Sequence, residues 1–186
     1  MKKCVTLLSV CSLVLVLAPL TAQALNMGVG SNFLGYQKAN LEVGLGLNSE
    51  LSPNDLELEL GAAVAIDLDR SSGTLVPKFL VPAHLGFNFL YPLSEAKSAK
   101  PATLYGFTYF FGLGAAPQVS FGLNFSDPQY YGGPYFQTGF RFKAHNYMTI
   151  QVQAEQELLF GGPDWISTNT RAGVSILLSW PPVPKK

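Results

Sequence analysis

Apolar and polar residues alternate one by one along most of this chain, and residues 171–180 show the pattern most clearly. Every second residue there is apolar, and the residues between are polar or small: Ala172, Val174, Ile176, Leu178 and Trp180 against Arg171, Gly173, Ser175 and Ser179. Because successive side chains of a β-strand point to opposite faces, this pattern predicts strands with one apolar and one polar face. A helix would repeat its apolar residues every three or four positions, so the chain is predicted to be all-β.

Residues 1–24 have the features of a secretory signal peptide. A basic start, an apolar run and small residues at a cleavage site follow one another: Lys2 and Lys3, residues 5–20, then Ala22 and Ala24. The apolar run is shorter than the roughly 20 residues that a spanning helix needs. We therefore expect cleavage after Ala24. The mature chain would then contain no thiol, because both cysteines, Cys4 and Cys11, lie in the signal.

The composition indicates a membrane protein rather than a soluble one. Charged residues make up only 13% of the chain, against roughly 25% in an ordinary soluble domain. The 12 basic and 12 acidic residues balance, so we expect no nucleic-acid partner. Strands with one lipid-facing side, in a chain with an export signal, predict an antiparallel up-and-down transmembrane β-barrel. We assign it to residues 25–180, followed by a Pro/Lys tail over 181–186.

The alternation divides the chain into eight strands. We predict them at 25–36, 40–48, 56–68, 78–91, 103–125, 136–143, 148–158 and 171–180. Pro117 leaves open whether Thr103–Phe125 is one strand or two, and the even strand number of bacterial barrels favours one. The predicted connections include 49–55, 126–134 and 160–169. Pro77 and Pro82 predict an irregular upper half of the fourth strand, because proline donates no ladder hydrogen bond.

The inner face of the predicted barrel carries the charges. An eight-stranded barrel is just wide enough for side chains to fill it, so inward charges must pair or meet water. The predicted lumenal charge network consists of Glu42, Glu57, Glu59, Lys78, His84, Arg141, Lys143, Glu155, Glu157 and Arg171. We expect Glu57 and Glu59 to lie at the depth of the bases at 141 and 143, Glu155 and Glu157 near Arg171, and Glu42 and His84 at middle depth. A salt-bridged plug is the favoured interpretation, and a gated polar path or a carboxylate–histidine site is the alternative.

Aromatic residues gather at both ends of the predicted strands, where membrane interfaces should lie. The inner-rim set is Tyr91, Tyr105, Phe142 and Trp180, and the outer-rim set is Phe33, Phe136, Phe160 and Trp165.

Catalysis is not expected. A lipid-modifying barrel needs a nucleophile activated by a base at its outer rim. The two histidines are His84, with no serine beside it, and His145, in a predicted periplasmic turn. They are too far apart in the chain to suggest a metal site, and no cofactor motif is present.

Together, the signal segment, the eight amphipathic strands, the lumenal acids and bases and the strand R-A-G-V-S-I-L-L-S-W resemble the small bacterial outer-membrane barrels. This group includes outer membrane protein X, the membrane domain of outer membrane protein A, and outer membrane protein W. The resemblance implies location in the bacterial outer membrane, contact with its lipids and insertion by the barrel-insertion machinery. Members commonly end on an aromatic residue, whereas this chain continues past Trp180.

Several roles are compatible with such a barrel. The barrel would have a mainly structural role, or it would bind partners in the cell envelope. A third role is the sideways passage of a small apolar solute through a barrel wall weakened at Pro77, Pro82 and Pro117. The alternative from another class is a secreted, lipocalin-like soluble barrel. In that protein Leu41, Val43 and Leu45 would line an apolar ligand cavity and the charged residues would face water.

Overall fold

The computed structural model describes residues 24–34, 38–52, 55–69, 76–94, 106–122, 125–145, 147–162 and 165–179. The segment before residue 24, Tyr105, Trp180 and the tail 181–186 lie outside the described residues, as do the side chains of Phe33 and Lys78. Within the described ranges, the structure contains no helix of the length and hydropathy that a membrane crossing requires.

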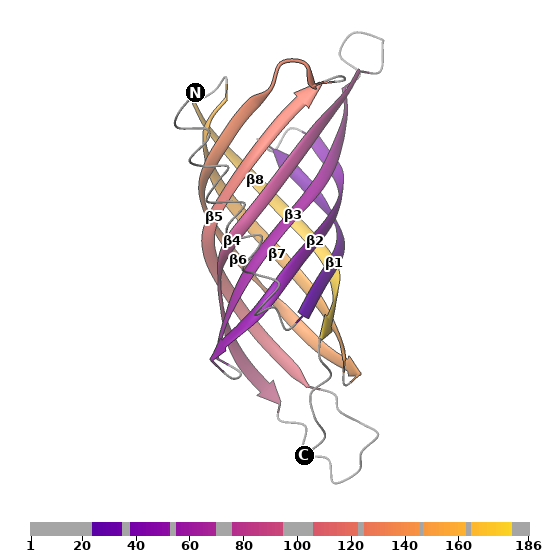
Figure 1. Ribbon diagram of the computed structural model, residues 1–186, viewed down its shortest axis with the longest axis vertical. Helices are drawn as coiled ribbons and strands as arrows, with labels where there is room; N and C mark the ends of the chain where they lie inside the picture. Colours follow the sequence, from indigo (N-terminus) through magenta and orange to yellow (C-terminus); the bar gives the residue numbers. More distant parts are fainter. Residues whose placement is uncertain are drawn as a thin grey trace.

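Eight antiparallel strands close into a barrel in chain order, which confirms the predicted fold (Figure 1). They are β1 (Ala24–Leu34), β2 (Lys38–Ser52), β3 (Leu56–Asp69), β4 (Val76–Ser94), β5 (Phe107–Gly122), β6 (Gln129–His145), β7 (Met148–Gly161) and β8 (Ile166–Ser179). β1 and β8 close the ring, with Ala24 opposite Ser179 and Leu34 opposite Asn169. We name the end with Ala24 and Ser179 the terminal end and the opposite one the distal end. The terminal end is at the bottom of Figure 1.

The strands are staggered around the ring. Following paired residues from Ala24 through all eight strands leads to Leu34, further along the same strand. A closed sheet with such a stagger must tilt its strands, and its interior is narrow enough for side chains to fill. Residues distant in sequence therefore meet inside the barrel at depths set by the stagger.

The outer face is apolar and the buried charged side chains lie on the inner face, as the alternation predicts. On β2, Leu41, Val43 and Leu45 are 72%, 57% and 61% exposed, whereas Glu42 between them is 7% exposed. Glu59 on β3 is completely buried. Because the three apolar side chains point away from the interior, the lipocalin-like alternative with its apolar ligand cavity is wrong.

β5 is one strand that passes Pro117 without changing its face alternation. Ala116 and Gln118 are buried on the inside, and Pro117 is exposed between them. Pro117 stays in register with Gly132 of β6. Proline is tolerated here because its missing N–H falls where β4 and β5 are unpaired, between the pairs Pro82–Gln118 and Leu85–Ala115.

The predicted irregularity of β4 is present at Pro82 and absent at Pro77. Pairing of β3 with β4 is interrupted between Ala62–Ala83 and Ala65–Leu80, on either side of Pro82, and the register is the same beyond the gap. Pro77, in contrast, keeps its place opposite Leu68 near the first residue of the strand, so the prediction for Pro77 is wrong.

Three predicted connections are wrong in extent because strands continue into them. β2 extends to Ser52, β6 begins at Gln129 rather than after Pro134, and β7 and β8 leave only a short turn between Gly161 and Ile166. Residues 129–134 pair with β5 although they contain two glycines and a proline. Phe136 consequently lies in the middle of β6 and not at the outer rim.

Candidate functional site

Two ionic layers and a cluster between them cross the interior of the barrel. The lower ionic layer, on the terminal side, is built around Arg141 of β6 and Glu57 of β3. The guanidinium donates from Nη1 and Nη2 to the two carboxylate oxygens of Glu57 at 2.9 and 2.7 Å, and from Nε to Gln151 at 2.6 Å. Asn48 donates to Glu57 at 2.6 Å, and the Phe110 ring lies 4.9 Å from the guanidinium carbon. Bidentate pairing fixes both side chains across the lumen.

The middle cluster surrounds Glu59. Its Oε1 lies 3.3 Å from Nε2 of His84, and its Oε2 accepts from Asn88 at 2.5 Å and from Gln137 at 2.6 Å. Asn88 also donates to Glu57 at 3.1 Å, which connects the middle cluster to the lower layer. Neutral amides therefore supply much of the hydrogen bonding that this buried carboxylate needs.

The upper ionic layer is centred on Arg171 of β8. Its Nε donates to both oxygens of Glu42 at 3.1 and 3.0 Å, and its Nη2 also contacts Glu42. Nη1 lies 3.2 Å from both oxygens of Glu155 and 3.5 Å from Glu157, whose other oxygen accepts from Asn169 at 2.6 Å. One guanidinium thus joins carboxylates from β2 and β7 through the interior.

Two inward-facing glycines make room for these contacts. A Cβ atom on Gly61 would collide with the His84 ring, and one on Gly112 would collide with Asn88 and Gln137. The sequence places small residues where the network needs space.

Among the described residues, the buried lumenal side chains include more acids than bases. They are five carboxylates and two guanidiniums, with His84 in addition: Glu42, Glu57, Glu59, Glu155 and Glu157 against Arg141 and Arg171. Lys143, predicted to pair here, is half-buried near the terminal end and forms no ion pair with the described residues. Glu42, expected at middle depth, instead contacts Arg171.

An apolar cluster lies in the distal part of the interior. Ala116, Tyr135 and Leu159 are almost fully buried there and form a core cluster with Tyr131 packed against it. The alternation predicts that these side chains point inward, but the predicted lumenal network consisted of charged residues and did not include them.

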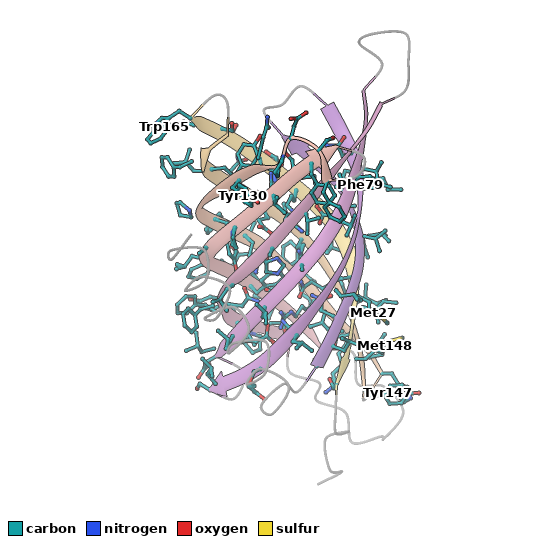
Figure 2. All side chains as sticks on the ribbon, turned by 45° about the horizontal axis from the view of Figure 1, so that its top comes forward. Met27, Phe79, Tyr130, Tyr147, Met148 and Trp165 are labelled. Carbon is teal, nitrogen blue, oxygen red and sulfur yellow. The ribbon has the colours of Figure 1, made fainter. Side chains whose placement is uncertain are left out.

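Aromatic side chains lie on the outer face near both ends. Tyr91 and Phe142 are 48% and 45% exposed towards the terminal end, and Trp165 is 72% exposed at the distal end. Figure 2 shows Trp165 and Tyr147 projecting from opposite ends of the barrel.

Clusters of metal ligands and pairs of a histidine with a hydroxyl nucleophile are not found among the described residues. They contain no group of three or more His, Cys, Asp or Glu that could hold a metal ion. No serine or threonine hydroxyl among them hydrogen-bonds to His84, whose ring contacts Glu59 instead.

Solved structures share this architecture. Neisserial surface protein A superimposes with a TM-score of 0.61 and 7% identity, over 84% of this chain and 96% of that chain. The fold is that of the small eight-stranded outer-membrane barrels. Ail of Yersinia pestis, solved with the heparin analogue sucrose octasulfate, gives 0.54 and 14% over 84% and 97%. The N-terminal barrel domain of Pseudomonas aeruginosa OprF gives 0.50 and 14% over 84% and 98%.

The likeness to these outer-membrane barrels concerns the fold. No protein-family model matches the chain, and no curated protein matches its sequence. The resemblance predicted from the strand pattern is confirmed at the level of architecture.

Proposed function

We propose that this chain is an integral protein of the bacterial outer membrane, exported with removal of residues 1–24. Its barrel serves as a closed structural element of that membrane rather than as an open pore or an enzyme. The observation that carries the proposal is the pair of ionic layers, Arg141 with Glu57 and Arg171 with Glu42, which cross the interior at two depths.

The outer face supports contact with lipid. The strands contain 11 to 19 residues, more than the roughly 9–11 that cross a bilayer. Their outward side chains are apolar over most of this length, with aromatics near both ends, which is the pattern of an outer-membrane barrel wall. Outer-membrane lipids are therefore the proposed surroundings, and the barrel-insertion machinery is the proposed route into them.

The ionic layers favour a closed lumen for an energetic reason. A pathway through the lower layer requires Arg141 and Glu57 to separate, and separating a buried ion pair costs about 3–5 kcal/mol unless water or another charge replaces the partner. At that cost, fewer than about one molecule in a hundred would be open.

Planar-bilayer conductance tests the closed lumen. The purified wild-type barrel should insert without stepwise conductance. In the test variant, serine replaces all four residues of the two cross-lumen pairs, Glu57/Arg141 and Glu42/Arg171. This variant should produce conductance steps because small side chains then replace the ionic layers. Asp127→Ser, in the exposed distal loop, is the control and should remain silent. Regular conductance steps from the wild-type barrel would refute the closed structural role.

A second candidate function is sideways passage of a small apolar solute. Each of three prolines lies within a gap between two strands: Pro82 in the β3–β4 ladder, Pro117 in the β4–β5 ladder and Pro134 in the β6–β7 ladder. The apolar core cluster of Ala116, Tyr135 and Leu159 lies on the inner side of this wall. Missing ladder hydrogen bonds weaken the wall locally, and the interior behind it suits an apolar molecule.

Restoring a backbone donor tests this second function. If solutes leave through the β3–β4 gap, Pro82→Ala should lower uptake of an apolar dye into vesicles that contain the barrel. Pro92→Ala, near the terminal end of the same strand, is the matched control and should leave uptake unchanged. Equal uptake by the wild type, both variants and protein-free vesicles would eliminate the lateral route.

A further inference from the structure

A polar patch interrupts the apolar outer wall of the barrel on β7, β8 and β1. Along each strand every second residue faces outward, and at this place those residues are small or are neutral and polar. We name this surface the outer polar patch, and its members are Ser31, Ala154, Gln156, Thr168, Thr170 and Ala172. Gln156 is paired with Thr170, and Ala172 is paired with both Ala154 and Ser31. The six side chains therefore form a continuous surface across three neighbouring strands.

The outer polar patch lies within the apolar wall and not at its edge. On β7, Gln156 is exposed, and the outward residues beyond the patch, Val152 on the terminal side and Leu158 on the distal side, are exposed and apolar. Elsewhere on the wall, every second residue is apolar from Leu41 to Leu47 on β2 and from Leu56 to Ile66 on β3. In the proposed membrane orientation, on which this inference rests, hydrocarbon would meet an amide and hydroxyls at this depth.

Hydrogen bonds within the patch leave its polar groups at the surface. Thr170 Oγ1 donates to Gln156 Oε1 at 2.7 Å, and this hydrogen bond is exposed. Gln156 Nε2 donates to the carbonyl oxygens of Asn169 at 3.2 Å and of Glu157 at 3.4 Å. These bonds reduce the cost of placing the amide against lipid, but hydrocarbon replaces none of the hydrogen bonds that water gives to exposed polar groups. Contact with another polar surface is therefore favoured over contact with lipid.

The outer polar patch is complementary to a second copy of itself. Its members carry no charge, the Gln156 amide contains both donors and an acceptor, and each hydroxyl can donate and accept. A two-fold axis brings the same surface of two copies together, so the donors of one copy meet the acceptors of the other. A patch with charge of one sign would instead repel its own copy. Ala154 and Ala172 let the two walls approach closely, as small residues do between spanning helices, where Ser, Thr and Gln side chains also form hydrogen bonds.

We propose that two copies of the barrel associate in the membrane through the outer polar patch, with Gln156 and Thr170 of each copy hydrogen-bonded to the other copy. The contact removes the amide and the hydroxyls from lipid and buries the two alanines. It uses outward side chains, so it is independent of whether the lumen conducts.

Energy transfer between labelled barrels in lipid vesicles tests the association. Donor and acceptor dyes are attached at Asp127→Cys in the exposed distal loop, and the barrels are diluted with phosphatidylcholine. Gln156→Leu should raise the dissociation constant about tenfold, because the two-fold contact loses two hydrogen bonds that each contribute roughly a factor of three. The leucine faces lipid in the monomer, so the fold is retained. An unchanged dissociation constant, or a wild-type barrel that is monomeric at every dilution, would overturn the proposal.

A matched pair of leucine variants locates the contact. Ala154→Leu places a larger side chain in the outer polar patch and should also weaken the association. Ala62→Leu makes the same change at an exposed position of β3, on the opposite side of the eight-stranded ring, and should leave the association unchanged. Equal weakening by the two variants would refute the assignment to the patch.

Cysteine cross-linking gives a second readout. The expected mature chain contains no cysteine of its own, so each introduced thiol reports one position. Among Gln156→Cys, Thr170→Cys and Ala172→Cys, at least one should form a disulfide-linked dimer under mild oxidation, whereas Ala62→Cys should remain monomeric. Monomers at all three patch positions, or equal cross-linking at position 62, would contradict the contact.

Flotation of the same vesicles separates this inference from the proposed membrane location. The expected result is barrels that float with the vesicles as dimers. Barrels that float and are monomeric refute the association alone, and barrels that stay in the buffer refute the membrane location together with the association.

Discussion

Arg171→Leu should lower the free energy of unfolding of the barrel by about 3–5 kcal/mol. The Arg171 guanidinium contacts Glu42, Glu155 and Glu157, all of which are buried. Leucine leaves these carboxylates close together without their cation, and water cannot readily reach them. Urea unfolding followed by tryptophan fluorescence measures the loss, and the mobility of unboiled samples on gels provides a second readout.

A compensated variant separates lost charge balance from lost packing. Arg171→Leu combined with Glu42→Gln, Glu155→Gln and Glu157→Gln removes the cation and the carboxylates together. Replacing a whole buried ionic group by neutral side chains is often close to neutral, so this variant should recover most of the loss. A change below about 1 kcal/mol for Arg171→Leu alone would show that the upper ionic layer does not stabilise the barrel.

The sequence predicts the strands and which of their faces points into the barrel, because successive side chains of a strand point to opposite faces. Leu41, Val43 and Leu45 alternate with inward residues, and the structure exposes all three. The same parity places Arg171 of β8 inside. No information about partner strands is required for either conclusion.

The ends of the strands depend on partners that a single sequence does not identify. Gly132, Gly133 and Pro134 have turn-forming chemistry, yet they extend β6 because β5 supplies a paired neighbour opposite each of them. The local preference of these residues for a turn is overridden by pairing with a strand that precedes them in the chain.

The partners inside the lumen were only partly predictable. Glu155 and Glu157 are near Arg171 in sequence-adjacent strands, and the structure brings them together. Glu42 reaches the same guanidinium because β2 is separated from β8 only by β1 across the closing seam. Whether a β2 side chain and a β8 side chain lie at the same depth in the lumen depends on the stagger of the strands around the ring. The alternation of inward and outward residues does not specify that stagger.

The uncharged members of the network were missed for a different reason. Asn88 and Gln137 lie on the predicted inner face, but a neutral amide has no obligatory partner of opposite charge. Their hydrogen bonds to Glu59 become visible only when β3, β4 and β6 are placed around one lumen. Phe110 was missed although the alternation that places Phe111 outside also places Phe110 inside, because the predicted lumenal network contained only charged residues.

Leu45→Arg should destabilise the barrel in a bilayer by about 2–4 kcal/mol. Leu45 is 61% exposed, lies at the middle of β2 and is flanked on the same face by Val43 and Leu47. In the proposed membrane orientation, its side chain faces hydrocarbon, where a guanidinium loses its hydration. In a protein surrounded by water, the same exposed position would accept arginine with a change within about 0.5 kcal/mol.

Urea titration of the barrel refolded into lipid vesicles measures this difference, with Leu45→Met as the apolar control. The methionine variant should unfold close to the wild type because its side chain retains apolar contact with lipid. A second arginine variant at Leu51, near the terminal end of β2, should cost less, because an arginine near the interface can reach water. Equal tolerance of arginine at positions 45 and 51 would contradict a membrane around the middle of the barrel, since only a hydrocarbon layer makes the cost depend on depth.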